Sequence, residues 1–264
     1  MKLKISFSSV DANSDPMDWI YRMEDIGFQG FEILDEGRQK VDGVLRNSLR
    51  NIYETTDLIL SLHAPLSDIN IASVNERMRE ESIRQIKESI ENTYEFIDNI
   101  CVVHPGTFSP LSMQMPEKAI QKSVAALITL CEFAADRGLR IAVENLTSAN
   151  MLMGRYPDEL IQIVRSARMD NLGVCVDIAH ANTTKKLDEF LGITAKADDV
   201  EIIHLHASDN FGTDDLHLPL GQGNQDWNKI MRGINNNGYE GVMVLELYTL
   251  NGGIESLEFI NNYR

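Results

Sequence analysis

The sequence has little cysteine, no long apolar run and a shortage of basic residues. Its three cysteines, Cys101, Cys131 and Cys175, form an odd count without a CxxC pair. This argues against a disulfide framework, and we expect buried free thiols in a reducing compartment. No apolar stretch approaches the roughly 18 residues that a membrane span requires. Residues 1–7 contain no signal-peptide core, so we expect a cytoplasmic protein that does not contact a membrane.

Basic residues are outnumbered, with 24 Lys and Arg against 40 Asp and Glu in 264 residues, and the formal net charge is −16. Proteins that hold nucleic acid by bulk electrostatics need clustered Lys and Arg, so the composition argues against that class. It does not exclude a locally basic or metal-lined groove. The contents of hydrophobic residues, 43%, and charged residues, 24%, are typical of a soluble globular enzyme.

Eight short segments rich in Val, Ile and Leu alternate with segments of helical period. The predicted strands are Leu3–Val10, Gly30–Asp35, Leu58–Pro65, Ile100–Gly106, Leu139–Asn145, Leu172–His180, Val200–Ser208 and Gly241–Tyr248. The helices predicted between them include Met17–Ile26, Asn75–Asp98, Met115–Arg137, Pro157–Arg168 and Trp227–Asn236. The strands are continuously apolar instead of alternating, which is typical of parallel strands covered on both faces.

The fold class follows from the number of these units and from a missing glycine-rich turn. Eight βα units in 264 residues match a (β/α)₈ TIM barrel in number and length. The alternative, an open doubly wound sheet, usually has a Gly-rich phosphate turn after its first strand. Residues 8–13 instead read Ser-Ser-Val-Asp-Ala-Asn, without glycine. We therefore predict an α/β protein with a single TIM-barrel domain over residues 1–264.

Chemically active residues gather at the predicted carboxyl ends of the strands, where TIM barrels place their catalytic groups. Every strand from the third to the eighth ends in, or is closely followed by, an imidazole or a carboxylate. These residues are His63, His104, Glu144, Asp177, His180, His206, Asp215, His217 and Glu246. A single such residue is more often an ordinary hydrogen-bonded polar group. So many together would repel one another or be costly to desolvate without cations, so we predict a divalent-metal site, with zinc or manganese suited to mixed ligands.

Several motifs support a resemblance to a known family. They are His63-Ala64-Pro65 followed by residues 68–73, Val103-His104-Pro105-Gly106, Glu144-Asn145, and residues 173–177 with His180. Over essentially its whole length the chain resembles the xylose isomerase-like TIM-barrel superfamily. That superfamily includes sugar isomerases, sugar epimerases and the endonuclease IV type of abasic-site nuclease.

The resemblance implies two alternative sites. In the nuclease branch a trinuclear metal site would fall on nine positions of this chain, all of the required residue type: His63, His104, Glu144, Asp177, His180, His206, Asp215, His217 and Glu246. In the isomerase and epimerase branches, Glu144, Asp177, His206 and Glu246 would hold one metal. His180 would then contact the substrate, and the two glutamates would act as acid and base.

Two stretches of the predicted rim favour the second branch. The family's Asn-Asp-Ser-Lys stretch after the seventh strand is replaced by residues 207–210, Ala-Ser-Asp-Asn, which lack the lysine. Residues 215–223, followed by Asp226-Trp227, resemble proteins described as sugar-phosphate isomerases or epimerases. The rim also offers few cations for a nucleic acid backbone, chiefly Arg38, Lys40, Arg155, Lys185 and Lys186.

Four residues are candidates for substrate binding: Glu32, Arg155, Gly221 and Gly223. Gly221 and Gly223 precede a predicted helix and could present backbone N–H groups to a phosphate, although a simple turn is an alternative. Glu32 ends the second strand and could shape the pocket or be an ordinary hydrogen-bonded carboxylate. His204 shares a strand face with His206, and we expect it in a core layer of the barrel.

The sequence thus predicts a metal-dependent isomerase or epimerase of a small sugar or sugar phosphate, with one to three zinc or manganese ions. Glu144, Glu246 and His180 are its predicted catalytic residues. The alternative is a phosphodiesterase that cleaves abasic DNA with a trinuclear zinc site, and only that alternative makes DNA a partner. A third class is a metal-binding barrel with a regulatory or storage role.

Overall fold

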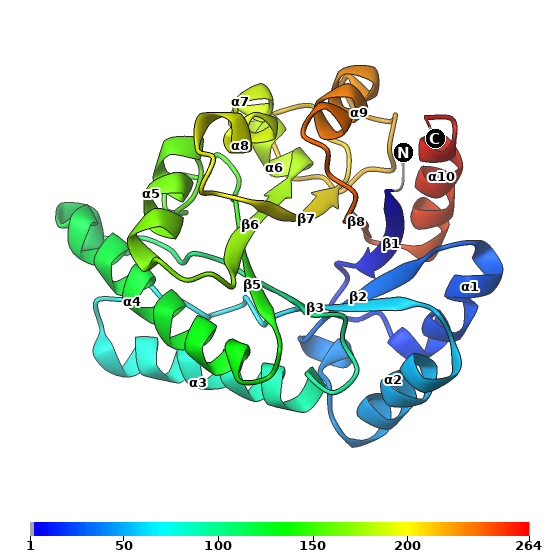
Figure 1. Cartoon of the computed structure of the whole chain (residues 1–264), viewed down its shortest axis with the longest axis horizontal. Helices are drawn as coiled ribbons and strands as arrows, with labels where there is room; N and C mark the ends of the chain where they lie inside the picture. Colours follow the sequence, from blue (N-terminus) through cyan, green and yellow to red (C-terminus); the bar gives the residue numbers. More distant parts are fainter. Residues whose placement is uncertain (1–2, 264) are drawn as a thin grey trace.

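The strands of the protein form the closed barrel that the sequence predicts. The computed structural model describes residues 3–263. Its strands are β1 (Lys4–Ser9), β2 (Gly30–Leu34), β3 (Ile59–His63), β4 (Ile100–Val103), β5 (Arg140–Glu144), β6 (Leu172–Asp177), β7 (Ile202–Ala207) and β8 (Val242–Leu247). All are parallel and pair in chain order, and β8 closes the ring on β1 (Figure 1). The single (β/α)₈ TIM barrel is confirmed.

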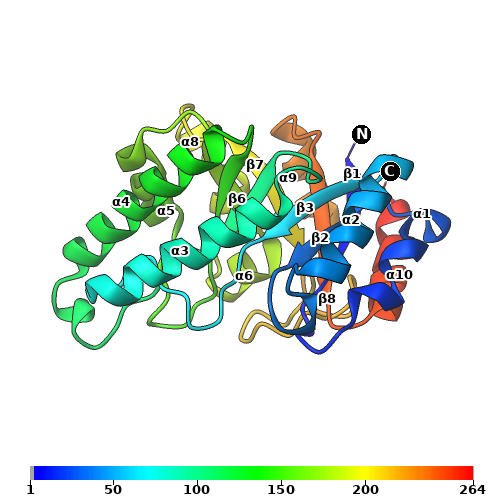
Figure 2. The same ribbon diagram turned by 90° about the horizontal axis from the view of Figure 1, so that it is seen from below.

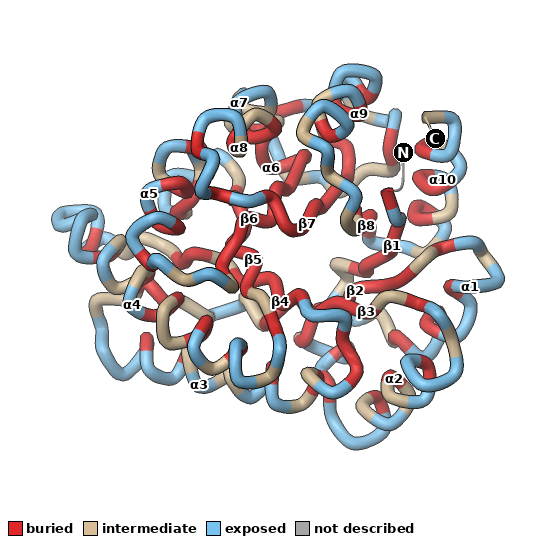
Figure 3. Tube along the Cα trace, viewed as in Figure 1, coloured by how far each residue is buried: buried red, intermediate tan, exposed pale blue. Residues whose placement is uncertain are grey.

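The helices surround this ring. They are α1 (Met23–Ile26), α2 (Gly43–Thr55), α3 (Glu76–Thr93), α4 (Pro116–Ala135), α5 (Pro157–Ala167), α6 (Ile178–Thr183), α7 (Leu187–Leu191), α8 (Ile193–Lys196), α9 (Trp227–Asn236) and α10 (Leu250–Asn261). Figure 3 shows the strands buried at the centre and the outer surfaces of the helices exposed. The predicted helix Trp227–Asn236 has the bounds of α9, and Asp226 caps it by accepting a hydrogen bond from the Lys229 N–H.

One predicted helix is interrupted. Over Met17–Ile26 the chain forms two 3₁₀ turns and then the short α1. Trp19 leaves helical geometry between the two turns, with φ −135° and ψ −28°. Its ring is buried edge-on against Phe7 and Phe31, at centroid distances of 5.2 and 5.7 Å. Packing of this ring against β1 and β2 therefore overrides local helix propensity.

Two apolar regions hold the barrel together. The larger core lies between the strands and the helices and includes residues such as Leu62, Leu127 and Leu160. A smaller cluster consists of Ile100, Val102, Ala142, Cys175 and Ile203. Since side chains alternate along a strand, Ala142 and Cys175 share the inward face with Glu144 and Asp177, which places this cluster inside the barrel. The three cysteines are buried and unpaired, as predicted.

The arrangement of the strands gathers their carboxyl ends on one rim. In Figure 2 the long loop after β7 lies at the same end of the barrel as the finish of β8. Along β7 the pairing with β6 shifts register, so that Val174 pairs with Ile202 whereas Cys175 pairs with His204. Ile203 is therefore an extra residue, a bulge of the kind that re-aims side chains near sites. No helix within residues 3–263 is long and apolar enough to cross a membrane.

Candidate metal centre

The structure brings all nine predicted ligands into one connected network at this rim. His63, Glu144, Asp177, His206 and Glu246 lie on β3, β5, β6, β7 and β8, His104 follows β4, His180 lies in α6, and Asp215 and His217 lie in the loop between β7 and α9. Every one of them has a nitrogen or oxygen within 4 Å of another member. The network therefore joins residues separated by up to 183 positions in the sequence, from His63 to Glu246.

Glu144 is the hub of this network. Its Oε2 atom lies 3.2 Å from Nε2 of His63 and 3.2 Å from Nε2 of His104. Its Oε1 atom lies 3.2 Å from Nδ1 of His180 and 3.4 Å from Nδ1 of His206. Burial opposes ionisation, but these imidazoles, led by His206, hold the pKa of the Glu144 carboxyl well below its ordinary value.

Four members of the network form the largest group of possible ligands within residues 3–263. One ligand atom from each of Glu144, Asp177, His206 and Glu246 lies within 4.8 Å of the others, and all four residues are buried. Asp177 Oδ1 caps α6 by accepting a hydrogen bond of 2.6 Å from the His180 N–H. Asp177 Oδ2 is buried without a hydrogen-bond partner in residues 3–263, so this atom is available to a cation.

Three of the histidines are anchored by backbone carbonyls. Nδ1 of His63 lies 2.8 Å from the Ala64 oxygen, Nδ1 of His180 lies 2.8 Å from the Asn145 oxygen, and Nδ1 of His217 lies 3.1 Å from the Glu246 oxygen. A carbonyl accepts only, so each Nδ1 carries the proton. Each Nε2 nevertheless lies 3.1–3.2 Å from a carboxylate oxygen. That contact is favourable with a second proton, on the ring or on the carboxyl group, or with a cation bound to both atoms.

Without a metal the site must therefore hold additional protons. Burial would lower the pKa of His63, but the Glu144 carboxylate outweighs it and raises the pKa to about 9. Burial opposes the shift at His217 as well, where Asp215 raises the pKa to about 9. Burial raises the pKa of Glu246 to about 7, with His206 opposing and Glu144 and Asp177 adding to the rise. A buried donor set of mixed imidazoles and carboxylates that binds excess protons fits a divalent cation.

Asn145 is a residue of this site that the sequence analysis did not single out for a role. Its side chain accepts a hydrogen bond of 2.8 Å from the Asp177 N–H and donates one of 3.0 Å to the Asp177 carbonyl. Its own carbonyl accepts from His180. Asn145 thus fixes two of the candidate ligands. The Glu144-Asn145 pair in the sequence was the available signal.

The four predicted substrate-binding residues do not lie together. Glu32 is fully buried beneath the network, where it contacts His204 and His206. His204 is buried inside the barrel, in the core position expected for it. Arg155 donates a hydrogen bond of 3.2 Å from Nη1 to the Ser148 carbonyl, within the loop after β5. The Arg155 contact involves none of the nine network residues, whereas Glu32 reaches the network through His206.

Gly221 and Gly223 pack around a buried carboxylate, Asp209. The Gly221 N–H donates to Asp209 Oδ2 at 2.9 Å, and Trp227 Nε1 donates to the same oxygen at 3.0 Å. A Cβ atom on Gly223 would lie 2.1 Å from Asp209 Oδ1. Because the Gly221 N–H is already used, this geometry favours the turn over an anion-binding loop. Asp209 holds together the loop that carries Asp215 and His217, a role that the sequence analysis missed.

The basic residues of the rim are mostly engaged with the chain itself. Arg38 Nη2 lies 2.6 Å from Asp15, Lys185 Nζ 2.6 Å from the Gly212 carbonyl, and Lys186 Nζ 2.6 Å from Glu189. With Arg155 on Ser148, four of the five predicted rim cations have partners of their own. This leaves little positive charge at the rim for the phosphates of a nucleic acid.

The fold and this cluster define a TIM barrel with a candidate metal centre at its carboxyl-end rim. The family described as xylose isomerase-like TIM barrel matches residues 20–263. The chain therefore belongs to the xylose isomerase-like TIM barrel family, as the motifs of the sequence indicate.

Several relatives are similar along much of this chain. The uncharacterized protein MJ1311 of Methanocaldococcus jannaschii is 32% identical over 236 residues, which cover 89% of this chain and 80% of that protein. Fructoselysine 3-epimerase of Shigella flexneri is 24% identical over 253 residues, with coverages of 89% and 86%. The protein named "Probable endonuclease 4" of Aquifex aeolicus is 27% identical over 174 residues, with coverages of 61% and 60%.

Two solved structures are also similar. The crystal structure of a D-tagatose 3-epimerase-like protein has 30% sequence identity and a TM-score of 0.92, and the match covers 99% of this chain and 97% of that one. The structure of the IolI protein with a bound zinc atom has 20% identity and a TM-score of 0.81, with coverages of 98% and 97%. At that lower identity the second likeness shows the fold alone.

Proposed function

We propose that this protein is a divalent-metal-dependent epimerase or isomerase of a small sugar or sugar phosphate. The observation that carries the proposal is the buried group of Glu144, Asp177, His206 and Glu246, whose ligand atoms lie within 4.8 Å of one another. The similarity to fructoselysine 3-epimerase and to the D-tagatose 3-epimerase-like protein supports it.

In this proposal the same four residues would hold the metal, which is zinc or manganese. When bound, such an ion polarises a sugar carbonyl and its neighbouring hydroxyl and so acidifies the C–H bond between them. The protein's own residues then have to remove a proton from that carbon and return one. Asp177 would hold the metal in a fixed position. Its backbone N–H is hydrogen-bonded to Asn145, and its Oδ1 atom accepts a hydrogen bond from the first turn of α6.

The two glutamates differ in a way that suits proton transfer. Glu144 is 1% exposed and is held ionised by the surrounding imidazoles. Glu246 is 6% exposed, and its pKa is raised to about 7 by burial. In the metal-free protein the two carboxyl groups thus differ in pKa, and Glu246 is the one that binds a proton more readily. We assign to Glu246 the exchange of a proton with the sugar. We assign to His180, which lies beside both Glu144 and Asp215, the contact with the substrate.

The experiment that tests this function is solvent deuterium exchange. Protein loaded with manganese or zinc is incubated in D₂O with a panel of ketohexoses and their phosphates. Proton NMR follows the signal of the hydrogen atom on the carbon beside the carbonyl. We expect metal-dependent loss of that signal and the growth of an epimer or isomer. Glu246→Gln should abolish exchange, whereas Glu240→Gln, an exposed carboxylate outside the network, should leave it unchanged. No exchange by a protein that retains its metal would contradict the proposal.

A second candidate function is cleavage of abasic DNA, and a specific observation favours it. The structure joins five further residues to the network, His63, His104, His180, Asp215 and His217, and a single-metal enzyme does not require all of them. The similarity to an endonuclease 4 points the same way. The test is nicking of a duplex oligonucleotide with one abasic site, with a chelator control. Metal-dependent cleavage at that site would establish the nuclease and replace the first proposal.

A further inference from the structure

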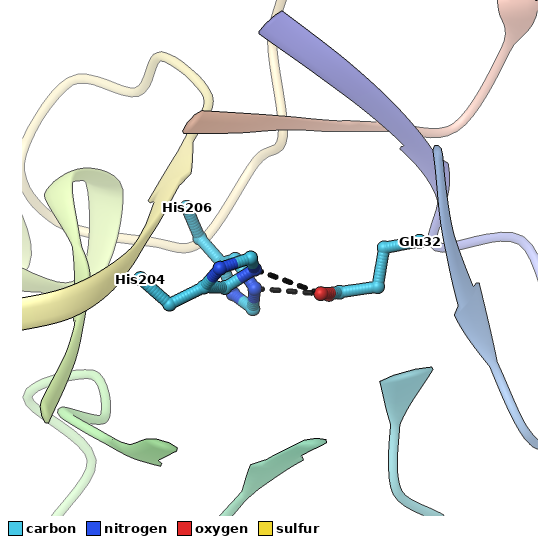
Figure 4. Close-up of side chains that lie close together, drawn as sticks. All are labelled: Glu32, His204 and His206. Carbon is cyan, nitrogen blue, oxygen red and sulfur yellow. Dashed lines mark hydrogen bonds and ion pairs between the residues drawn. The ribbon is translucent and has the colours of Figure 1, made fainter. Parts of the chain in front are cut away.

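A carboxylate bridges two strands that are not neighbours in the barrel. Glu32 lies on β2, whereas His204 and His206 lie on β7, and the strand order separates these two strands. Glu32 Oε2 lies 2.8 Å from Nε2 of His204, and Glu32 Oε1 lies 2.9 Å from Nε2 of His206. Figure 4 shows both imidazoles pointing at the one carboxylate. The bridge therefore crosses the interior of the barrel.

The bridge is sealed from solvent. Glu32 and His206 are 0% exposed and His204 is 1% exposed. Ser61 on β3 also donates a hydrogen bond of 2.7 Å to Glu32 Oε2, so that oxygen receives two donors. Glu32 Oε1 and His206 Nε2 are both buried and form no hydrogen bond within residues 3–263. They lie 2.9 Å apart, at the distance of an ion pair, so the contact between them is electrostatic.

His206 uses its two ring nitrogens in the opposite sense to three other histidines of the site. In His63, His180 and His217, Nδ1 is anchored by a backbone carbonyl and Nε2 faces a carboxylate. In His206, Nε2 faces Glu32, and Nδ1 lies 3.4 Å from Glu144 Oε1 and 3.3 Å from Glu246 Oε1. Glu32 thus occupies, for His206, the place that a backbone carbonyl occupies for the others.

We propose that Glu32 is a positioning residue that keeps the proton of His206 on Nε2 and so presents the lone pair of Nδ1 to the metal. The inference rests on the proposed function, since it takes His206 to be a metal ligand. His204 braces Glu32 from the same strand as His206. A ligand imidazole whose other nitrogen is fixed by a carboxylate has a defined tautomer and ring orientation. In this role Glu32 contacts His206 and is not itself a ligand of the metal.

The first test uses the wild-type protein loaded with zinc. Two-bond ¹H–¹⁵N correlation spectra of labelled histidine identify which ring nitrogen of His206 carries the proton, with His206→Gln used for assignment. We expect a proton on Nε2 and a zinc-shifted Nδ1. A proton on Nδ1, or a His206 ring that zinc leaves unshifted, would overturn the proposal.

The second test measures zinc affinity by competition with a chromophoric chelator. Glu32→Gln offers only one acceptor oxygen to two imidazoles, and we expect zinc to bind about 10- to 100-fold more weakly and the His206 tautomer to become mixed. Glu32→Asp should recover part of the affinity, because it restores the carboxylate. Ser61→Ala removes one donor from Glu32 but leaves both imidazole contacts, so its effect should be much smaller.

These measurements separate the proposal from the proposed function. If wild-type zinc binding shifts His206 but no sugar is turned over, the function fails while the role of Glu32 stands. If zinc binds through His206 and Glu32→Gln leaves the affinity and the tautomer unchanged, the role of Glu32 is disproved. Should Glu32→Gln fail to fold, the wild-type tautomer and the Glu32→Asp affinity still decide the question.

Discussion

Nε2 of His217 lies 3.1 Å from Oδ2 of Asp215, two residues earlier in the same loop, while Nδ1 of His217 faces the Glu246 carbonyl. This imidazole is therefore held between a carbonyl and a carboxylate. In the metal-free protein it is stable there as an imidazolium, and this state makes the stability of the protein depend on pH.

We expect the metal-free protein to lose stability as the pH rises from 6.5 to 9. An unfolded histidine has a pKa of about 6.5, whereas the pKa values of folded His63 and His217 are about 9. The folded state binds more protons in this window, so its stabilisation is complete below pH 6.5 and is lost as the pH passes through 9. Urea unfolding with a chelator present should show a loss of at least about 1 kcal/mol across the window.

The control for this prediction is the zinc-loaded protein. Zinc replaces the extra protons. The difference in the free energy of unfolding between the zinc-loaded and the metal-free protein should therefore grow as the pH rises. His217→Gln should flatten part of the dependence in the metal-free protein. A metal-free urea midpoint that rises with pH would contradict the assignment of these protons.

Glu144→Ala should abolish both metal retention and turnover. The substitution removes the hub of the network, which contacts His63, His104, His180 and His206. Elemental analysis should show the loss of metal, and turnover should fall at least about a thousandfold, equivalent to about 4 kcal/mol. Glu240→Gln serves as the control. Full activity of Glu144→Ala would refute the whole ligand assignment.

His104→Ala tests how many metal ions the activity needs. His104 contacts Glu144 at 3.2 Å but lies outside the four-residue group. A single-metal epimerase should keep its turnover within about tenfold of wild type, or about 1.4 kcal/mol. A trinuclear nuclease should lose more than about a hundredfold, since His104 would be a direct ligand. The metal content, measured alongside, should fall only in the second case.

Gly223→Ala should destabilise the loop between β7 and α9. The added methyl group would lie 2.1 Å from Asp209 Oδ1 and 2.3 Å from the Asn210 carbonyl oxygen. We expect a loss of about 1–3 kcal/mol in the free energy of unfolding. Gly43→Ala is the matched control, because nothing lies within 4 Å of its added carbon. It should be neutral or stabilising by up to about 1 kcal/mol. Equal stabilities of the two variants would refute the role given to Asp209.

The barrel could be predicted from the sequence because its signals are local. Each strand is a short apolar run, and seven of the nine candidate ligands lie at or within three residues of the end of such a run, so topology alone gathers those seven on one rim. The interruption at Trp19 could not be predicted in this way, because it depends on Phe7 and Phe31, which pack against Trp19 only in the folded barrel.

The details beneath and beside the site depend on contacts between distant residues. The contact of Glu32 with His204 and His206 forms only when the closed barrel places β2 and β7 across its interior. Likewise, Gly221 and Gly223 fit both an anion-binding loop and a turn when their spacing alone is considered. The buried Asp209 decides between them, and its position is a property of the folded loop.

The nine candidate ligands come from β3 to β8 and the segments that follow them, whereas β1 and β2 supply none of the nine. The loops after β1 and β2, residues 10–15 and 35–42, therefore contain none of the candidate metal ligands. These two loops could be exchanged without replacing any of the nine candidate ligands. The candidate ligands thus occupy one arc of the rim, from β3 to β8, and the loops after β1 and β2 complete the circle.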